Sequence, residues 1–298
     1  MISIFAPTGI GEVGPDTDLA GEICAAVEAD PAGPLLSGDI VVVTSKIISK
    51  AESRYRPAGE REAAINEESV RTVARRGPTK IVSTRHGLTL AAAGVDNSNV
   101  AMGSILLLPV DPDGSAARLR RELQSRCGAV VGVIISDTAG RAWRMGQTDQ
   151  AIGAAGVRVI ESYEGRHDSY GNELQVTAIA IADELAAAAD LAKSKLANRP
   201  VAVIRGLSQH LSDDSSDTET GAAVLVREES QDLFRHGSRE AVIAAVLTAT
   251  GQGERYEEVV ASDDATLVES VVAGSGRREA EGDLLRSILG SALSRLDR

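Results

Sequence analysis

Aromatic side chains are scarce in this chain, at 2% of 298 residues. The core must therefore consist of Val, Ile, Leu and Ala, which suits layered strands and helices better than platforms for stacked nucleic-acid bases. An excess of positive charge is also missing, because the formal net charge is −12. Nucleic acids and anionic membranes are polyanions, so the charge excludes both as bulk partners.

Cysteines and long apolar runs are equally rare. The two cysteines, Cys24 and Cys127, lie far apart in the sequence, and Cys24 falls within an apolar helical pattern. We therefore expect neither a disulfide nor a cysteine metal site, and we expect a reducing, cytoplasmic location. The N-terminus has no basic region, and no stretch is long enough to span a membrane. The sequence thus predicts a protein that is neither exported nor anchored.

Several catalytic signatures are absent as well. The chain has no GxxxxGK[ST] segment, so any nucleotide must bind without a P-loop. The four histidines are scattered, with no HxxxH or HExxH spacing. Zinc hydrolysis and Ser-His-Asp catalysis therefore gain no support.

Apolar segments of strand and helix type alternate as far as about residue 250, which predicts an α/β or α+β fold. The expected strands cover residues 2–5, 40–43, 80–84, 129–135 and 200–204, and the expected helices cover 61–76 and 182–196, with another from Ser238. Ser115 is expected to cap a helix, and the acidic segment 212–219 to be a surface loop. We assign residues 1–250 to one domain and 251–298 to a helical tail.

A glycine pattern, Gly9-Ile10-Gly11-Glu12-Val13-Gly14, follows the first expected strand. Its spacing is that of a dinucleotide-binding turn, which would make the chain an NAD-dependent oxidoreductase. The strand 40–43, however, ends in Thr44-Ser45-Lys46 and not in the acid that would hold a ribose hydroxyl. A plain flexible turn and a loop that contacts a nucleotide in another way are the two alternatives.

Polar residues follow two of the expected buried strands. Segment 44–50 carries hydroxyl and ammonium groups that suit phosphate oxygens, although a solvated strand end is the alternative. Asp137 and Thr138 follow Ser136 at the end of the strand 129–135, and Asp96 leaves an apolar segment before Asn97. Such oxygens are the ligands that Mg²⁺ or Mn²⁺ prefers, whereas the alternatives are a cap for Asp137 and an Asx turn for Asp96.

Several motifs taken together resemble the coenzyme F420-0:L-glutamate ligase family, also called F420 γ-glutamyl ligase. They are, in chain order, residues 38–50, 93–99, 137–144, 146–149, 168–174 and 182–186. The resemblance is to the N-terminal ligase domain of the actinobacterial bifunctional F420 biosynthesis protein. Only about fifty residues follow here, which is too few for the flavin-binding domain of that protein, so the resemblance does not extend to FMN or to a reductase activity.

The resemblance implies GTP-dependent addition of L-glutamate to F420-0 and then of further γ-linked glutamates. It implies two divalent metals per subunit, Mg²⁺ or Mn²⁺, with K⁺, and an intertwined homodimer of two-lobed α+β subunits. By position, the metal ligands would be Asp96 and Asp137 for one ion and Thr138 for the other, and these residues would act through the metals. The implied GTP contacts are Ile10, Gly11, Glu12, Val13, Ser45, Lys50 and Asn99. A non-catalytic nucleotide- or deazaflavin-binding module is the remaining rival.

Overall fold

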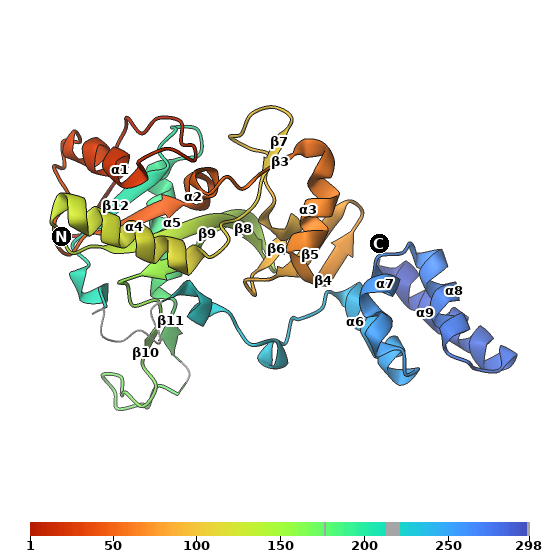
Figure 1. Cartoon of the computed structure of the whole chain (residues 1–298). Helices are drawn as coiled ribbons and strands as arrows, with labels where there is room; N and C mark the ends of the chain where they lie inside the picture. Colours follow the sequence, from red (N-terminus) through yellow and green to blue (C-terminus); the bar gives the residue numbers. More distant parts are fainter. Residues whose placement is uncertain (176, 213–220, 297–298) are drawn as a thin grey trace. The chain divides into compact units, whose positions relative to one another are not determined.

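The computed structural model describes residues 1–175, 177–212 and 221–296, and the chain forms two compact units. The first unit comprises Met1–Ala64 and Val95–Arg227, and the second comprises Ile65–Gly94 and Glu228–Arg298. Both units combine helices with sheets, so the expected α+β class is confirmed (Figure 1). Residues 213–220, which include most of the expected acidic loop, lie outside the described residues.

A five-stranded mixed sheet forms the centre of the first unit, in the order β1-β12-β2-β8-β9. Only β2 and β8 run parallel, and every other neighbouring pair is antiparallel. The first unit also contains two separate two-stranded antiparallel sheets, one of β3 with β7 and the other of β10 with β11. The bounds are β1 Ser3–Phe5, β2 Ile40–Thr44, β3 Tyr55–Pro57, β7 Ser104–Leu106, β8 Gly132–Arg141, β9 Arg144–Ala155, β10 Glu161–Ser162, β11 Ala178–Ile179 and β12 Val201–Arg205.

Helices cover both faces of this sheet. On one face, α5 (Ile181–Lys193) packs Ala182, Leu185 and Ala189 against Ile40, Ile134 and other alternate residues of the strands. On the opposite face lie α4 (Pro112–Cys127) and α1 (Leu19–Glu28), which pack against each other. The start of α4 lies so close to β9 that position 153 requires glycine, because a Cβ there would lie 2.4 Å from the Pro112 carbonyl oxygen. The short helix α2 (Ser45–Ala51) continues directly from β2.

The second unit contains a three-stranded antiparallel sheet and a group of helices. The sheet has the order β4 (Ser69–Arg76), β5 (Thr79–Thr84) and β6 (Thr89–Ala91), and α3 (Arg61–Glu68) leads into it from the first unit. The helices are α6 Ser238–Ala249, α7 Tyr256–Val260, α8 Asp264–Gly274 and α9 Glu279–Leu296. Ile243, Val259, Leu267 and Leu289 are among the residues that form their common core.

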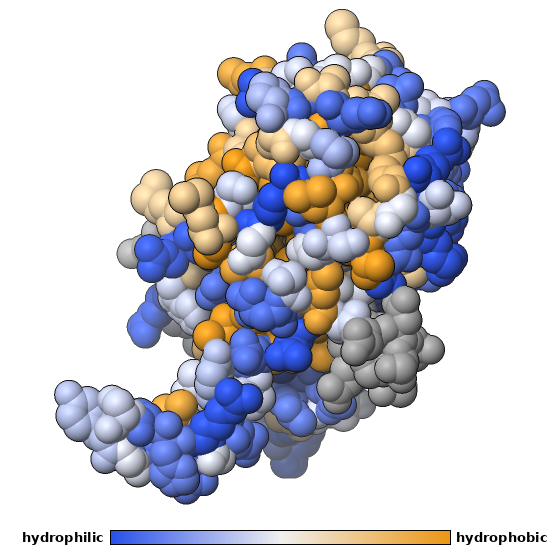
Figure 2. Space-filling view, turned by 90° about the vertical axis from the view of Figure 1, so that its left-hand side faces the viewer, coloured by the Kyte–Doolittle hydropathy of each residue, from blue (hydrophilic) through white to orange (hydrophobic). Residues whose placement is uncertain are grey.

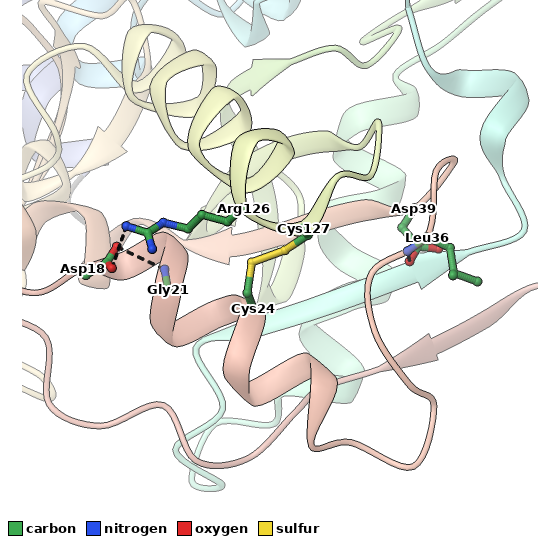
Figure 3. The surroundings of a disulfide bond; sticks show 7 residues. All are labelled: Asp18, Gly21, Cys24, Leu36, Asp39, Arg126 and Cys127. Carbon is green, nitrogen blue, oxygen red and sulfur yellow. Dashed lines mark hydrogen bonds and ion pairs between the residues drawn. A yellow bond between two sulfur atoms is a disulfide. The ribbon is translucent and has the colours of Figure 1, made fainter.

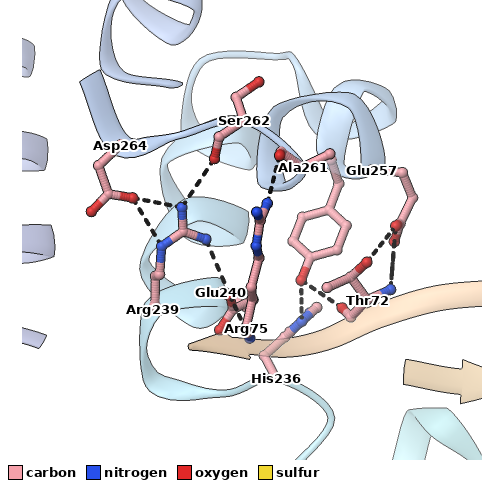
Figure 4. Close-up of polar contacts among 10 residues, drawn as sticks. Thr72, Arg75, His236, Arg239, Glu240, Glu257, Ala261, Ser262 and Asp264 are labelled. Atoms are coloured by element: carbon pink, nitrogen blue, oxygen red, sulfur yellow. Dashed lines mark hydrogen bonds and ion pairs between the residues drawn. The ribbon is translucent and has the colours of Figure 1, made fainter. Parts of the chain in front are cut away.

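Polar contacts join these helices to the edge strand β4 (Figure 4). Glu257 accepts hydrogen bonds from the backbone N–H of Thr72 at 2.9 Å and from its hydroxyl at 3.0 Å. The Tyr256 hydroxyl donates to the Thr72 carbonyl oxygen at 2.9 Å, and burial, followed by the nearby Glu240 and Glu257, raises the pKa of Tyr256 so that this proton is retained. The helices thus satisfy backbone groups that an edge strand would otherwise expose.

We expect Tyr256→Phe to lower the free energy of unfolding by about 1–2 kcal/mol, because the hydroxyl loses its hydrogen bond to the Thr72 carbonyl oxygen and its contact with Nδ1 of His236 at 3.2 Å. Urea titration of the variant beside the parent measures the difference. Tyr170→Phe is the matched control, since Tyr170 is 90% exposed. Equal midpoints for Tyr256→Phe and Tyr170→Phe would show that the contact contributes nothing.

Three local expectations were wrong. Residues 61–76 are not one helix, because only 61–68 are helical and Ser69–Arg76, which contains Val70, Thr72 and Val73, pairs with β5. The strand expected at 129–135 is β8, which continues through the polar residues to Arg141 because β9 supplies backbone partners along its length. Ser115 is not a cap: Asp111 caps α4 by accepting from Gly114, and Ser115 is buried where it donates to Glu52.

The expectation of unpaired cysteines was also wrong, because Cys24 and Cys127 form a disulfide. Figure 3 shows the bond joining α1 to the end of α4, beside an ion pair between Arg126 and Asp18 of 2.7 Å. The two cysteines are 103 residues apart in sequence. They meet because both helices pack on the same face of the sheet, a contact that sequence spacing does not reveal.

Replacing Cys24 by Ser should lower the free energy of unfolding by about 2–4 kcal/mol, since the bond closes a long loop and so restricts the unfolded chain. Denaturant unfolding of the oxidised parent and of the variant gives the loss. Cys127→Ser and reduction of the parent with dithiothreitol should each produce the same loss. Identical midpoints for the oxidised parent and Cys24→Ser would contradict the assignment.

Within the described residues, none of the helices has the length and the apolar content that crossing a bilayer requires.

On the face in Figure 2, hydrophobic residues gather in patches that hydrophilic residues border.

Candidate active site

The parallel pairing of β2 with β8 creates the centre of the site. Thr44 is in register with Ser136, so both strands present polar residues at the same edge of the sheet. Ser45 begins α2 and donates a hydrogen bond of 2.8 Å from Oγ to Oδ1 of Asp137. The carboxyl ends of neighbouring parallel strands are where open sheets commonly place ligands.

Asp96 reaches the same edge through α2. Its Oδ2 forms an ion pair of 2.5 Å with Nζ of Lys46, and its Oδ1 accepts from the backbone N–H of Ser98 at 2.8 Å. The hydrogen bond from Ser98 forms the Asx turn that the sequence left as an alternative. The ion pair with Lys46 holds the Asp96 carboxylate beside α2. Burial favours the neutral acid, but the hydrogen bonds from Lys46 and Ser98 outweigh it and lower the pKa of Asp96.

Asp137 carries negative charge that its surroundings do not fully compensate. Burial, together with the charges of Asp149 and Asp96, raises its pKa to about 6, although the hydrogen bond from Ser45 and the charge of Lys46 oppose the shift. Among the residues that the structure describes, Asp137 belongs to no ion pair. A buried carboxylate beside two others therefore favours a cation in its vicinity.

Thr138 belongs to a buried network that sequence reasoning missed. Its Oγ1 donates to Oδ1 of Asp149 at 2.7 Å, and Oδ2 of Asp149 pairs with Nζ of Lys193 at 2.8 Å. Ser136 also contacts both Asp149 and Lys193. Burial opposes ionisation of Asp149, but Lys193 outweighs it and lowers the pKa of Asp149. The overlooked signal is that Lys193 follows Ala189 at i+4 on the apolar face of α5.

A cavity of about 730 Å³ opens beside these groups, entirely within the first unit. Of the residues that the resemblance implicates, Ile10, Gly11, Glu12, Val13, Lys50, Asn99 and Thr138 line it. Glu12 and Lys50, which both line the cavity, form an ion pair with each other. Ser45, Asp96 and Asp137 are not part of the lining and instead contact the site through their hydrogen bonds and ion pair.

The glycine pattern 9–14 does not form a dinucleotide-binding turn. It leaves β1, which is an edge strand antiparallel to β12, and α1 begins only at Leu19. In a dinucleotide fold the glycines lead directly from a parallel strand into a helix. The oxidoreductase interpretation is therefore not favoured, and the pattern serves as one wall of the cavity.

The donor set fits a hard divalent ion that is held only partly by protein. Within the described ranges, no three His, Cys, Asp or Glu side chains converge to enclose a metal. Asp96, Asp137 and Thr138 nevertheless offer oxygen atoms at one edge of the sheet, and Asp137 lies among uncompensated negative charge. Mg²⁺ commonly takes one or two protein oxygens and completes its shell with water and substrate phosphates.

Comparisons with known proteins agree on one family. The family model described as F420-0:Gamma-glutamyl ligase matches residues 9–206, which include every site residue above. The coenzyme F420:L-glutamate ligase of Methanothermobacter thermautotrophicus is 38% identical over 257 residues, covering 78% of this chain and 99% of the relative. That of Archaeoglobus fulgidus is 37% identical over 253 residues, covering 78% and 96%, and that of Methanopyrus kandleri is 34% identical over 244 residues, covering 75% and 94%.

A layered α+β unit with this polar cavity, and with such relatives, is an enzyme of the ligase class. The chain belongs to the F420-0:γ-glutamyl ligase family, and its place is in coenzyme F420 biosynthesis. The resemblance inferred from the sequence motifs is therefore confirmed.

Proposed function

We propose that this chain joins L-glutamate to F420-0 in a GTP-dependent reaction and then adds further γ-linked glutamates. One observation carries the proposal: at a single sheet edge, the lysines 46, 50 and 193 and the aspartates 96, 137 and 149 gather beside a cavity lined by the expected nucleotide loop. The names of the relatives support glutamate and a form of coenzyme F420 as substrates.

The proposed chemistry proceeds in two steps. A carboxylate oxygen of the acceptor attacks the γ-phosphorus of GTP, the bond to the β-γ bridging oxygen breaks, and GDP leaves. The neutral amine of L-glutamate then attacks the carbon of the resulting acyl phosphate. Phosphate departs with the electron pair of the carbon–oxygen bond, and the nitrogen releases a proton to water. In such phosphoryl transfer, an enzyme lowers the activation barrier mainly by positioning the reactants and by stabilising the negative charge.

The side chains of this site have distinct roles in the proposal. The loop 10–13, Ser45, Lys50 and Asn99 would bind GTP, with Lys50 leaving Glu12 to meet a phosphate oxygen. Asp96 and Asp137 would hold one divalent ion and Thr138 a second, and Mg²⁺ or Mn²⁺ bound there would neutralise charge on the phosphoryl group. K⁺ completes the proposed cofactors.

The deciding experiment incubates the protein with F420-0, GTP, Mn²⁺, K⁺ and L-glutamate and follows the products by mass spectrometry. We expect species heavier by one or more glutamate units, GDP in matching amount, and no product without GTP or after chelation of the metal. GTP binding with unchanged F420-0 would favour the non-catalytic module instead. Light scattering of the same sample tests the proposed homodimer.

A further inference from the structure

The disulfide connects helix α1 to an element that is fixed on the central sheet. Cys24 lies in the second turn of α1, and Cys127 is the last residue of α4 (Figure 3). The buried Arg120 of α4 donates from Nε to the Val131 carbonyl oxygen at 2.7 Å, just before β8 begins. Through α4, the bond therefore limits how far α1 can move relative to the strands that carry the site.

The segment before α1 forms part of the cavity wall. Residues 10–13 line the cavity, and Val13 is only 3% exposed. A closed turn leads from there to α1: the backbone N–H of Gly14 donates to Oγ1 of Thr17 at 2.9 Å, and that of Thr17 donates to the Gly14 carbonyl oxygen at 3.1 Å. Asp18 then caps α1. Because these hydrogen bonds hold the connection, a movement of α1 is transmitted to the residues that line the cavity.

The bond itself lies where thiols in solution can reach it. Both cysteines are half-buried, and the neighbouring Gly128 is exposed. The ion pair of Arg126 with Asp18 beside the bond is also at the surface, with side chains that are 49% and 56% exposed. An accessible disulfide exchanges with thiols and follows the redox state of its surroundings. An exposed ion pair contributes little, so it does not replace the bond once that is reduced.

Non-covalent packing holds α1 in place only in part. Ala20, Ile23 and Val27 are fully buried on one face of the helix, which packs against α4. These contacts keep α1 folded on the unit after reduction. The segment before it is held more weakly, however, because it is an irregular loop without a sheet partner of its own. Local opening of such a segment requires far less free energy than unfolding of the core.

We propose that the Cys24–Cys127 disulfide is a redox-sensitive device: it holds residues 10–13 in the conformation that binds nucleotide, and its reduction lowers the affinity for GTP. The inference rests on the proposed function, in which GTP is the ligand of this loop. The thiolate of a small thiol such as glutathione attacks one sulfur of the bond, and the other sulfur leaves as a thiolate and takes up a proton. A second thiol attacks the mixed disulfide in the same way. Two thiols thereby become one disulfide, and the protein gains two electrons and two protons as free Cys24 and Cys127.

The test is titration with a fluorescent GTP analogue in the presence of Mg²⁺, for the oxidised parent and for the parent reduced with dithiothreitol. We expect Kd to rise about fivefold or more on reduction, because the binding-competent conformation of the loop becomes a minor part of the population. Reoxidation with oxidised glutathione should restore the original Kd. Equal Kd values for the oxidised and the reduced parent would overturn the inference.

Cys24→Ser/Cys127→Ser is the matched control, since it removes both cysteines of the chain. Its Kd should equal that of the reduced parent, both with and without dithiothreitol. A Kd equal to that of the oxidised parent would show that the bond does not position the loop.

Hydrogen exchange followed by mass spectrometry distinguishes this device from a general loss of stability. On reduction, the amides of residues 9–18 should exchange faster, whereas those of β2 and β8 at the centre of the sheet should keep their rates. Equal acceleration in the loop and in both strands would reject the device, because reduction would then loosen the whole unit.

The same measurement separates this inference from the proposed function. If the oxidised parent binds no GTP analogue, the proposed role of GTP fails, and hydrogen exchange alone decides the inference. Faster exchange of residues 10–13 in the reduced parent and in Cys24→Ser/Cys127→Ser than in the oxidised parent supports it. Equal exchange in all three rejects it.

Discussion

Asp137→Asn should reduce kcat for glutamate ligation by about 10³-fold, the largest effect on activity that we expect from one substitution. The amide has the size of the carboxylate but lacks its charge, so it cannot help to hold a divalent ion beside the γ-phosphate. Asp137 accepts from Ser45 at 2.8 Å, and an amide oxygen can accept the same hydrogen bond. Single-turnover measurement of GDP formation with saturating F420-0 isolates the phosphoryl-transfer step.

The stability of the same variant provides the control for folding. Asp137 has a pKa of about 6 in the folded protein, above the ordinary 3.8, so at neutral pH the fold disfavours its ionised form. A neutral amide removes that penalty, and Asp137→Asn should unfold at a denaturant concentration no lower than the parent. Asp30→Asn, in a surface turn where Asp30 accepts from Ala32, should change neither property. Near-normal GDP formation by a folded Asp137→Asn protein would refute the role of this carboxylate.

Lys193→Met should lower the free energy of unfolding by about 3–5 kcal/mol, the largest effect on stability that we expect. The side chains of Lys193 and Asp149 are only 6% and 3% exposed, and removing the ammonium group leaves Asp149 buried and charged. Methionine keeps the length and the apolar stem of lysine, so the loss reports on charge more than on packing. Guanidinium titration followed by circular dichroism gives the difference.

A double variant separates the effect of the unpaired Asp149 charge from the loss of the Lys193 side chain. Lys193→Met/Asp149→Asn has no uncompensated charge, so it should regain most of the stability that Lys193→Met loses. Lys195→Met is the matched control, because Lys195 lies two residues further along in an exposed position. A double variant that is no more stable than Lys193→Met would show that packing, not charge, governs this site.

Local features were predictable wherever residue type and spacing decide the outcome. The run Ile40–Val43 is apolar and β-branched, and it forms a strand buried on both faces. The helix at Ile181–Lys193 follows from its apolar periodicity. In contrast, Ser69–Arg76 was mistaken for a helical continuation, because its strand conformation depends on hydrogen bonds from β5. Strand propensity is weak compared with the effect of an available partner.

By itself, the sequence determined the α+β class, the family, and the polar residues at the ends of two buried strands, since these depend on composition, periodicity and motif spacing. Only the tertiary structure decided that Cys24 meets Cys127, that Lys193 neutralises Asp149, and that the loop bearing Lys195 and Arg199 lines the cavity. Each of these contacts joins elements that are distant in the chain but packed on one sheet. Register and helix packing set such pairings, and neither is encoded in the spacing of neighbouring residues.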